Sequence, residues 1–140
     1  MPNQIYPNTL DKNLAIHLNL GDVNSLPSKM DVYAGIYDIT KDCTDHFQGE
    51  IALSPGLNQI GLAPGKRVYI VVAAIDGGNF LSRSRSFTKR QGALLDPRPG
   101  RRYEIIINYI DEMWDFRLYD VNTTRRQSLP VVSISACKPS

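Results

Sequence analysis

The chain has 140 residues, of which 42% are hydrophobic and 21% are charged, and its formal net charge is +2. This length suits a single domain that buries enough surface to form a core without a structural metal. No apolar run approaches the roughly 20 residues of a transmembrane helix, so the composition argues against a membrane-spanning class.

Alternation of apolar and polar residues predicts strands in the first half of the chain. Residues 14–20 and 32–37 each place apolar side chains at a period of two, which is typical of a strand with one buried face. The polar stretch 38–48 is predicted to be a loop. Short strands are predicted at 51–53 and 57–62, joined by a Pro-Gly turn.

The second half continues the pattern of short strands. Residues 68–75 are apolar without a break, which indicates a central strand, and 80–87 is predicted as the next one. Residues 103–110 and 114–119 alternate on either side of Asp-Glu and predict a hairpin. Residues 131–137 are predicted to form the last strand, which gives about eight or nine strands in all.

Two proline-glycine turns lead into a tyrosine and a run of β-branched residues. Pro64-Gly65 precedes Tyr69, and Pro99-Gly100 precedes Tyr103. Such turns, followed by a tyrosine that buries its ring and bonds through its hydroxyl, are typical of the corners of antiparallel sandwiches.

No stretch shows a helical period with caps, which excludes a doubly wound α/β fold. The sequence therefore predicts an all-β fold: a single antiparallel β-sandwich of immunoglobulin or fibronectin type. The domain is expected over residues 13–137, and residues 1–12 are expected to be loose unless they dock.

Cys43 and Cys137 are the two cysteines, far apart and without the spacing of a zinc site. In an exported chain they are expected to form a disulfide that ties the C-terminal segment to the loop after an early strand. The alternative is a pair of separate buried thiols in a reducing compartment.

Charge is unevenly distributed along the chain. Residues 1–60 hold three basic and seven acidic side chains, so the remainder carries a net +6. The excess predicts a positive edge that binds a protein partner or an anionic surface, and the alternative is a solvated face. The candidate partner-binding residues are Arg83, Arg85, Lys89, Arg90, Arg98, Arg101 and Arg102.

Candidate catalytic residues are few. A nucleophile set can be drawn from Cys43, His46 and either Asp42 or Asp45, but proximity in a polar loop does not supply the geometry that a nucleophile and its base need. Four carboxylates are candidate calcium ligands, but their spacing does not match the twelve-residue calcium loop. They are Asp38, Asp42, Asp45 and Glu50. We expect no catalytic residue, no metal and no cofactor.

Five aromatic residues occur at strand spacing: Tyr33, Tyr37, Trp114, Phe116 and Tyr119. They form either core and cross-strand pairs, which is the commoner outcome, or an exposed platform for a sugar or a peptide. Few aromatic residues accompany the basic stretch, so no nucleic acid is expected as a partner.

The turn and corner residues also carry a resemblance that covers about residues 32–121. These residues are Cys43, Gly49, Ile51, Leu53, Leu62, Pro64, Gly65, Lys66, Ser86, Phe87, Thr88, Pro99, Gly100 and Tyr103. Their spacing resembles that of small bacterial periplasmic or outer-membrane lipoproteins with an immunoglobulin-like sandwich and no assigned function. The resemblance implies a place in the cell envelope and a lipid anchor outside this chain, and it implies no catalytic residue.

Together these observations predict a non-enzymatic, exported β-sandwich that acts by protein–protein contact. It is expected to be a cell-envelope lipoprotein domain or an accessory part of a secretion or surface assembly. A carbohydrate- or ligand-binding module requires several aromatic residues on one exposed face, and a small inhibitor or immunity protein would use a charged edge. The oligomeric state is left open.

Overall fold

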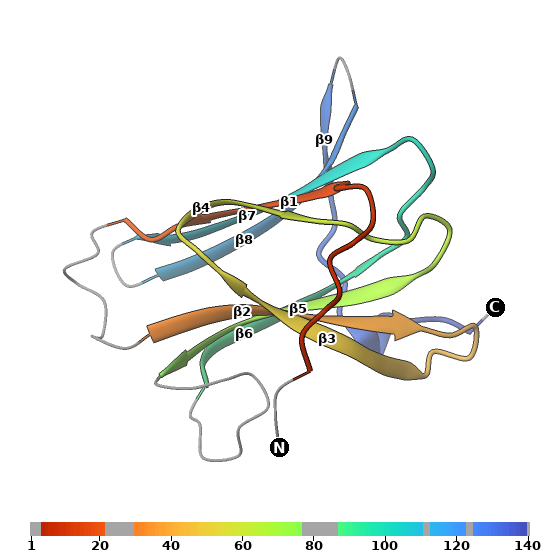
Figure 1. Ribbon diagram of the computed structural model, residues 1–140, viewed down its shortest axis with the longest axis horizontal. Coiled ribbons are helices and arrows are strands. Elements are labelled where there is room, and N and C mark those ends of the chain that lie inside the picture. Colours follow the sequence, from red (N-terminus) through yellow and green to blue (C-terminus); the bar gives the residue numbers. More distant parts are fainter. Residues whose placement is uncertain (1–3, 22–29, 77–86, 111–112, 123–124, 140) are drawn as a thin grey trace.

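The computed structural model describes residues 4–21, 30–76, 87–110, 113–122 and 125–139. Nine strands and one 3-10 helix within these ranges form two packed sheets (Figure 1), which confirms the predicted β-sandwich. The elements are β1 (Leu14–Asn19), β2 (Met30–Ile39), β3 (Asp45–Leu53), β4 (Gly56–Ile60), β5 (Val68–Asp76), β6 (Phe87–Leu95), β7 (Arg102–Ile110), β8 (Met113–Val121), β9 (Arg126–Leu129) and η2 (Ile134–Ala136).

One sheet has the strand order β4-β1-β7-β8-β9 and the other has β3-β2-β5-β6. The pairs are antiparallel except for β1 and β7, which run parallel with Leu14 opposite Tyr103. The predicted antiparallel β-sandwich is confirmed, with one parallel pair that the sequence did not indicate. Among the described strands, the chain changes sheets four times: between β1 and β2, between β3 and β4 across Ser54 and Pro55, between β4 and β5, and between β6 and β7.

The core lies between the two sheets, because alternate residues of each strand point inward. Ile16, Ile70 and Ile105 have no exposed surface, and Ile36 has 1%. The apolar phase predicted for β1, β2 and β7 is the buried one in each case.

The two proline-glycine corners lie against each other. Gly65 and Gly100 have φ angles of 80° and 76°, a left-handed conformation that glycine adopts without strain. The Gly65 N–H donates to the carbonyl of Pro97 at 2.7 Å. This bond joins the corner before β5 to the corner before β7.

The two corner tyrosines differ in their surroundings. Tyr103 is buried, and its hydroxyl accepts from the Arg98 N–H at 3.0 Å and donates to the Asp96 carbonyl at 3.4 Å. Tyr69 lies instead on the outer face of its sheet, where its ring covers Gly92. The predicted corner role therefore holds for Tyr103 and is wrong for Tyr69.

The four-stranded sheet differs from the sequence prediction in the loop between β2 and β3 and in strand β6. The predicted loop 38–48 shrinks to 40–44, because β2 extends to Ile39 and β3 begins at Asp45. Strand β6 was not predicted, since Lys89 and Gln91 occupy its inward phase and hide the alternation. The strand predicted at 80–87 falls almost wholly on residues outside the described ranges.

The predicted closing strand at 131–137 is wrong. The last strand is β9, and Pro130 follows it without an N–H to donate to the ladder. The chain then forms η2, where the Ser133 hydroxyl accepts from the Ser135 N–H. One ladder-like bond remains, from the Leu94 N–H to the Val132 carbonyl at 2.9 Å.

The N-terminal segment crosses the edge of the sandwich beside β3 (Figure 1). The Tyr6 N–H donates to the Glu50 carbonyl at 3.0 Å, and the Glu50 N–H donates to the backbone carbonyl of Gln4 at 2.9 Å. The Tyr6 hydroxyl donates to the Gly61 carbonyl at 2.7 Å. Residues 4–6 therefore dock on both β3 and the end of β4.

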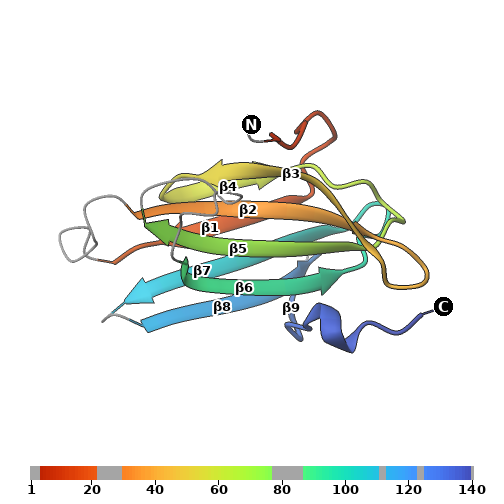
Figure 2. The ribbon, with the colours of Figure 1, turned by 90° about the horizontal axis from the view of Figure 1, so that it is seen from below.

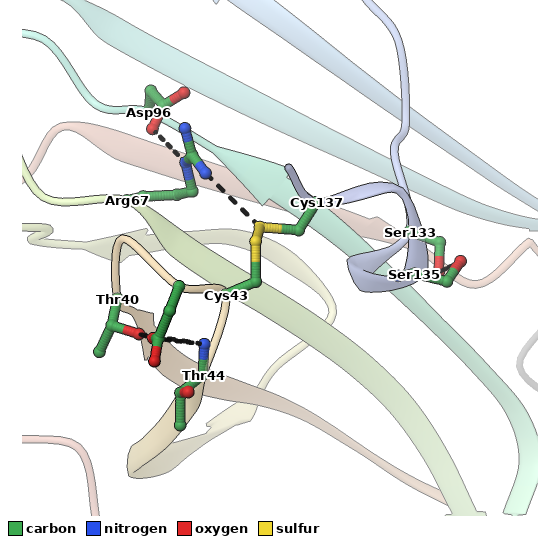
Figure 3. The surroundings of a disulfide bond; sticks show 9 residues. Thr40, Cys43, Thr44, Arg67, Asp96, Ser133, Ser135 and Cys137 are labelled. Atoms are coloured by element: carbon green, nitrogen blue, oxygen red, sulfur yellow. Dashed lines mark hydrogen bonds and ion pairs between the residues drawn. A yellow bond between two sulfur atoms is a disulfide. The ribbon is translucent and has the colours of Figure 1, made fainter. Parts of the chain in front are cut away.

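The predicted disulfide joins Cys43 to Cys137, with Cα atoms 6.0 Å apart (Figure 3). Cys43 lies in the β2–β3 turn with a φ of 67°, and the turn is closed by the bond from the Thr40 N–H to the Thr44 carbonyl. Arg67 Nη1 lies 3.5 Å from Cys137 Sγ. The bond fixes the C-terminal segment beside the end of the four-stranded sheet.

Candidate functional site

Strands β6 and β8 face each other across one long side of the sandwich, where each sheet ends or nearly ends (Figure 2). We call the gap between them the seam. Strand β9 pairs with Leu118–Val121 only, so in the described part of the chain Met113–Arg117 has no strand on its outer side. In a strand paired on one side, alternate N–H and C=O groups point away from the neighbour, so this edge is a template for another strand.

Pro130 explains why β9 stops short. Continuing β9 beyond Leu129 would place Pro130 opposite Arg117, and proline has no N–H for the ladder. The chain instead crosses the seam toward β6, where Val132 accepts the bond from Leu94. The crossing segment, Pro130–Val132, divides the seam into two parts of different chemistry.

On one side of the crossing segment lies a pocket of about 210 Å³ with both apolar and polar lining residues, which we call the seam pocket. Its apolar lining combines aliphatic residues with two aromatic residues of β8, and its polar lining comes from β6 and β8. The residues are Val32, Val72, Ala74, Ile107, Trp114, Phe116 and Val131, with Lys89 and Gln91 of β6 and Asp115 of β8.

Trp114 is the only tryptophan of the chain, and it packs on Tyr109 with ring centroids 4.5 Å apart. The two residues are cross-strand partners in the β7–β8 hairpin. This pair fixes the indole in the wall of the pocket.

On the other side of the crossing segment lies a wider hollow of about 610 Å³, lined by charged residues. Arg67 pairs with Asp96 at 3.1 Å, and Arg101 pairs with Asp120 at 3.4 Å. Arg98 and Lys138 also line the hollow. The two pairs match both acidic side chains of the hollow, and Arg98 and Lys138 leave it with a net positive charge.

The predicted basic residues do not form one patch in the part of the chain that is described. Lys89 and Arg90 lie near the start of β6, whereas Arg98, Arg101 and Arg102 lie beyond its end. At a rise of about 3.3 Å per residue, β6 separates the two groups by roughly 20 Å. Arg83 and Arg85 fall outside the described residues.

The five aromatic residues at strand spacing do not form one platform, because they are distributed over three surfaces. Trp114 and Phe116 line the seam pocket, and Tyr119 lies on the outer face of its sheet with Arg126 4.2 Å above its ring. Tyr33 and Tyr37 lie on the outer face of the four-stranded sheet.

Sequence analysis missed two further members of that outer face, Phe47 and Tyr69. Phe47 was assigned to a loop, and Tyr69 lies in an unbroken apolar run in which alternation gives no phase. Together with Tyr33 and Tyr37 they cover the buried pair Val71 and Ala73. Burial raises the pKa of Tyr37 above its ordinary value, and nearby Arg90 opposes that shift.

The sequence candidates for catalysis do not assemble. Cys43 is bonded to Cys137, so it offers no thiolate nucleophile. Asp45 and His46 are exposed residues at the start of β3. Across the described ranges, no three His, Cys, Asp or Glu side chains are placed to share a metal ion, and Asp38 pairs with Lys66.

No protein-family model matches the sequence, and no curated protein is significantly similar to it. Within the described ranges, no helix has the length and apolarity needed to cross a membrane.

Proposed function

We propose that this protein is a non-enzymatic interaction module of the bacterial cell envelope whose partner adds an extended segment at the seam. The observation that carries the proposal is the unpaired edge of β8, which runs directly beside the seam pocket. Strand addition uses these two elements together, since the edge supplies backbone hydrogen bonds and the pocket receives an alternate side chain.

The size of the seam pocket favours a peptide side chain over a whole small molecule. Small-molecule sites measure about 300–1,000 Å³. An apolar cavity of about 150 Å³ accepts benzene. At about 210 Å³, the seam pocket matches one aromatic or branched aliphatic side chain.

The disulfide supports a place outside the reducing cytoplasm, because such bonds persist in oxidising compartments such as the periplasm. On this basis we propose a periplasmic or outer-membrane-associated protein, either a lipoprotein domain or an accessory part of a secretion or surface assembly. Its action needs no cofactor.

A photo-crosslinking comparison tests the seam. Benzoylphenylalanine replaces Met113 at the β8 edge in one variant and Leu57 on β4, at the opposite edge of the same sheet, in the other. These side chains are 73% and 55% exposed, so they form a matched pair. In cell-envelope extract we expect the Met113 variant to capture a partner that the Leu57 variant does not.

The captured partner is then purified and added to the wild-type protein during amide hydrogen exchange. The proposal expects protection of the amides in Met113–Arg117. A partner that binds without protecting these amides, or one that crosslinks equally from position 57, contradicts strand addition at the seam.

A second candidate function follows from the aromatic outer face formed by Tyr33, Tyr37, Phe47 and Tyr69. Several aromatic rings on one exposed face are what a carbohydrate-binding module requires. Affinity electrophoresis in gels containing cell-wall polysaccharide tests this: retardation that a Tyr33→Ala, Tyr37→Ala double variant loses while staying folded favours it. Unchanged mobility of the wild type in every polysaccharide gel removes it.

A further inference from the structure

We infer that the segment that fills the seam is an acidic β-strand, with an apolar anchor for the seam pocket and a carboxylate two residues away that pairs with Lys89. This inference rests on the proposed function and names the chemistry of the partner. It follows from the position, charge and surroundings of Lys89.

Lys89 occupies an inward position of β6. It lies opposite Ala74, a core residue, and both residues line the seam pocket. Strands β6 and β8 begin at the same end of the sandwich (Figure 2), so Lys89, the third residue of β6, faces the part of β8 that contains Trp114. A charged side chain on the inner phase of an edge strand has to reach the mouth of the pocket to be solvated.

A strand that continues the line of β9 would direct alternate side chains into the seam. Such side chains are spaced by about 6.6 Å, twice the rise per residue. One of these side chains would enter the seam pocket between Phe116 and Gln91. The next inward side chain, two residues nearer to the first residues of β6 and β8, would lie beside Lys89. The seam thus reads two positions of the partner, i and i+2.

The charge of Lys89 is not matched within the described part of the chain. No acidic side chain there lies within ion-pair distance of its ammonium group, whereas the nearby Asp115 carboxylate is 2.9 Å from Arg117. Lys89 is exposed, so its ammonium group is open to a partner. A carboxylate of the bound strand would meet this unmatched charge at the mouth of the pocket, and the strand itself would lessen the screening of the pair by covering it.

The charge of Asp115 disfavours a second copy of this chain as the occupant. Symmetric antiparallel pairing of two β8 edges through Met113–Arg117 would place Asp115 of each copy opposite Asp115 of the other. Like charges at facing strand positions are destabilising. A strand from a different protein avoids this repulsion when its carboxylate lies beside Lys89 rather than opposite Asp115.

Three synthetic heptapeptides with blocked ends test the inference: STFTETS, STFTKTS and STSTETS. The first carries the anchor and the acid, the second replaces the acid by lysine, and the third replaces the anchor by serine. Binding is followed by Trp114 fluorescence and by amide chemical shifts. We expect the first peptide to bind about fivefold more tightly than the second, and the third to bind too weakly to saturate.

The variant Lys89→Glu should reverse the preference between the glutamate and lysine peptides. Arg90→Glu makes the same charge change on the other face of β6 and should leave the preference in place. Added salt should reduce the preference, because screening weakens the ion pair.

Equal affinities of the two charged peptides, or equal effects of the two variants, overturn the acidic preference but leave strand addition standing. Absence of shifts in Met113–Arg117 with all three peptides at millimolar concentration overturns the proposed function as well. Shifts of these amides that grow with protein concentration, without peptide, show that a second copy fills the seam and overturn the inference.

Discussion

The hydroxyl of Tyr103 bonds two backbone groups of the corner before β7, at Arg98 and Asp96, while its ring is buried in the core. Replacing Tyr103 by Phe keeps the ring and leaves the buried partners unsatisfied, so we expect a loss of about 1–2 kcal/mol in the free energy of unfolding. Urea denaturation measures this. The control Tyr119→Phe, on the outer face, should change the stability by less than about 0.5 kcal/mol.

Asp42 shows the pH dependence of the β2–β3 turn. Hydrogen bonds from the Thr40 hydroxyl, and then from Thr44, hold the pKa of its carboxyl below the usual 3.8. Because the pKa is lowered in the folded state, the carboxylate stabilises the fold at pH values above its ordinary pKa. This contribution is lost as the pH falls through the lowered pKa.

NMR titration of the Asp42 carboxyl should therefore give a pKa below 3.8, and Thr40→Val should raise it. Thr9→Val, in the N-terminal segment, is the matched control and should leave the pKa of Asp42 where it is. A pKa that does not respond to Thr40→Val contradicts the assignment of the bond.

At the scale of the elements, the docking of the N-terminal segment on β3 depends on one glycine. Gly49 has a φ of 138°, and a Cβ there would lie 2.4 Å from the Tyr6 backbone nitrogen. Gly56 also has a positive φ, 97°, but a Cβ there would meet no atom within 4 Å. Both alanine variants are strained, and only the Gly49 variant displaces the docked segment.

We expect Gly49→Ala to cost about 1–3 kcal/mol more than Gly56→Ala, because overpacking adds to the strain. Thermal or urea unfolding of both variants measures the difference. In a chain lacking residues 1–7 the extra cost should disappear. If it persists, the strain of Gly49 and not the docking of the segment causes it.

The strands that could be predicted from sequence are those with one buried and one exposed face. Residues 14–20 and the hairpin of β7 and β8 alternate cleanly, so the buried face of each strand followed directly, as did the pairing of β7 with β8. The partners of the first strand, β4 and β7, did not. Strand β6 could not be found, because its inward phase begins with Lys89 and Gln91, polar residues at the open end of the seam. Residues 131–137 alternate like a strand, but Pro130 lacks the N–H that the ladder needs, and the chain crosses toward β6 instead.

At the scale of the whole molecule, the candidate site could not be predicted, because β6, β8 and the crossing segment are brought together only by the two-sheet arrangement. Sequence analysis did name these residues, but it placed Lys89 on a basic edge and left Trp114 and Phe116 between core pairs and an exposed platform. Their common location beside the seam pocket depends on where β9 ends, which is a property of the fold.

The disulfide closes a ring between residues 94 positions apart. For a ring of this span, the chain-entropy relation gives about 4–5 kcal/mol of stabilisation. We expect reduction, or the Cys43→Ser, Cys137→Ser double variant, to lower the free energy of unfolding by an amount of this order. The Leu94 amide should also exchange faster, since the segment that holds Val132 loses its anchor.

Urea unfolding with and without reductant and amide exchange at Leu94 make these two measurements. Thiol labelling of the denatured, unreduced protein should find no free cysteine. Two labelled thiols in freshly purified protein would contradict the bond.

The parallel pairing of β1 with β7 has a consequence for how the chain folds. The first strand of the sandwich lies between β4 and β7, and its long partner comes near the end of the chain. Contacts between such distant segments form slowly, because the loop between them must be ordered before they contribute. The part of the core that β1 and β7 share can therefore form only after β7 has been synthesised, so the earliest strand of the sandwich waits for one of the last.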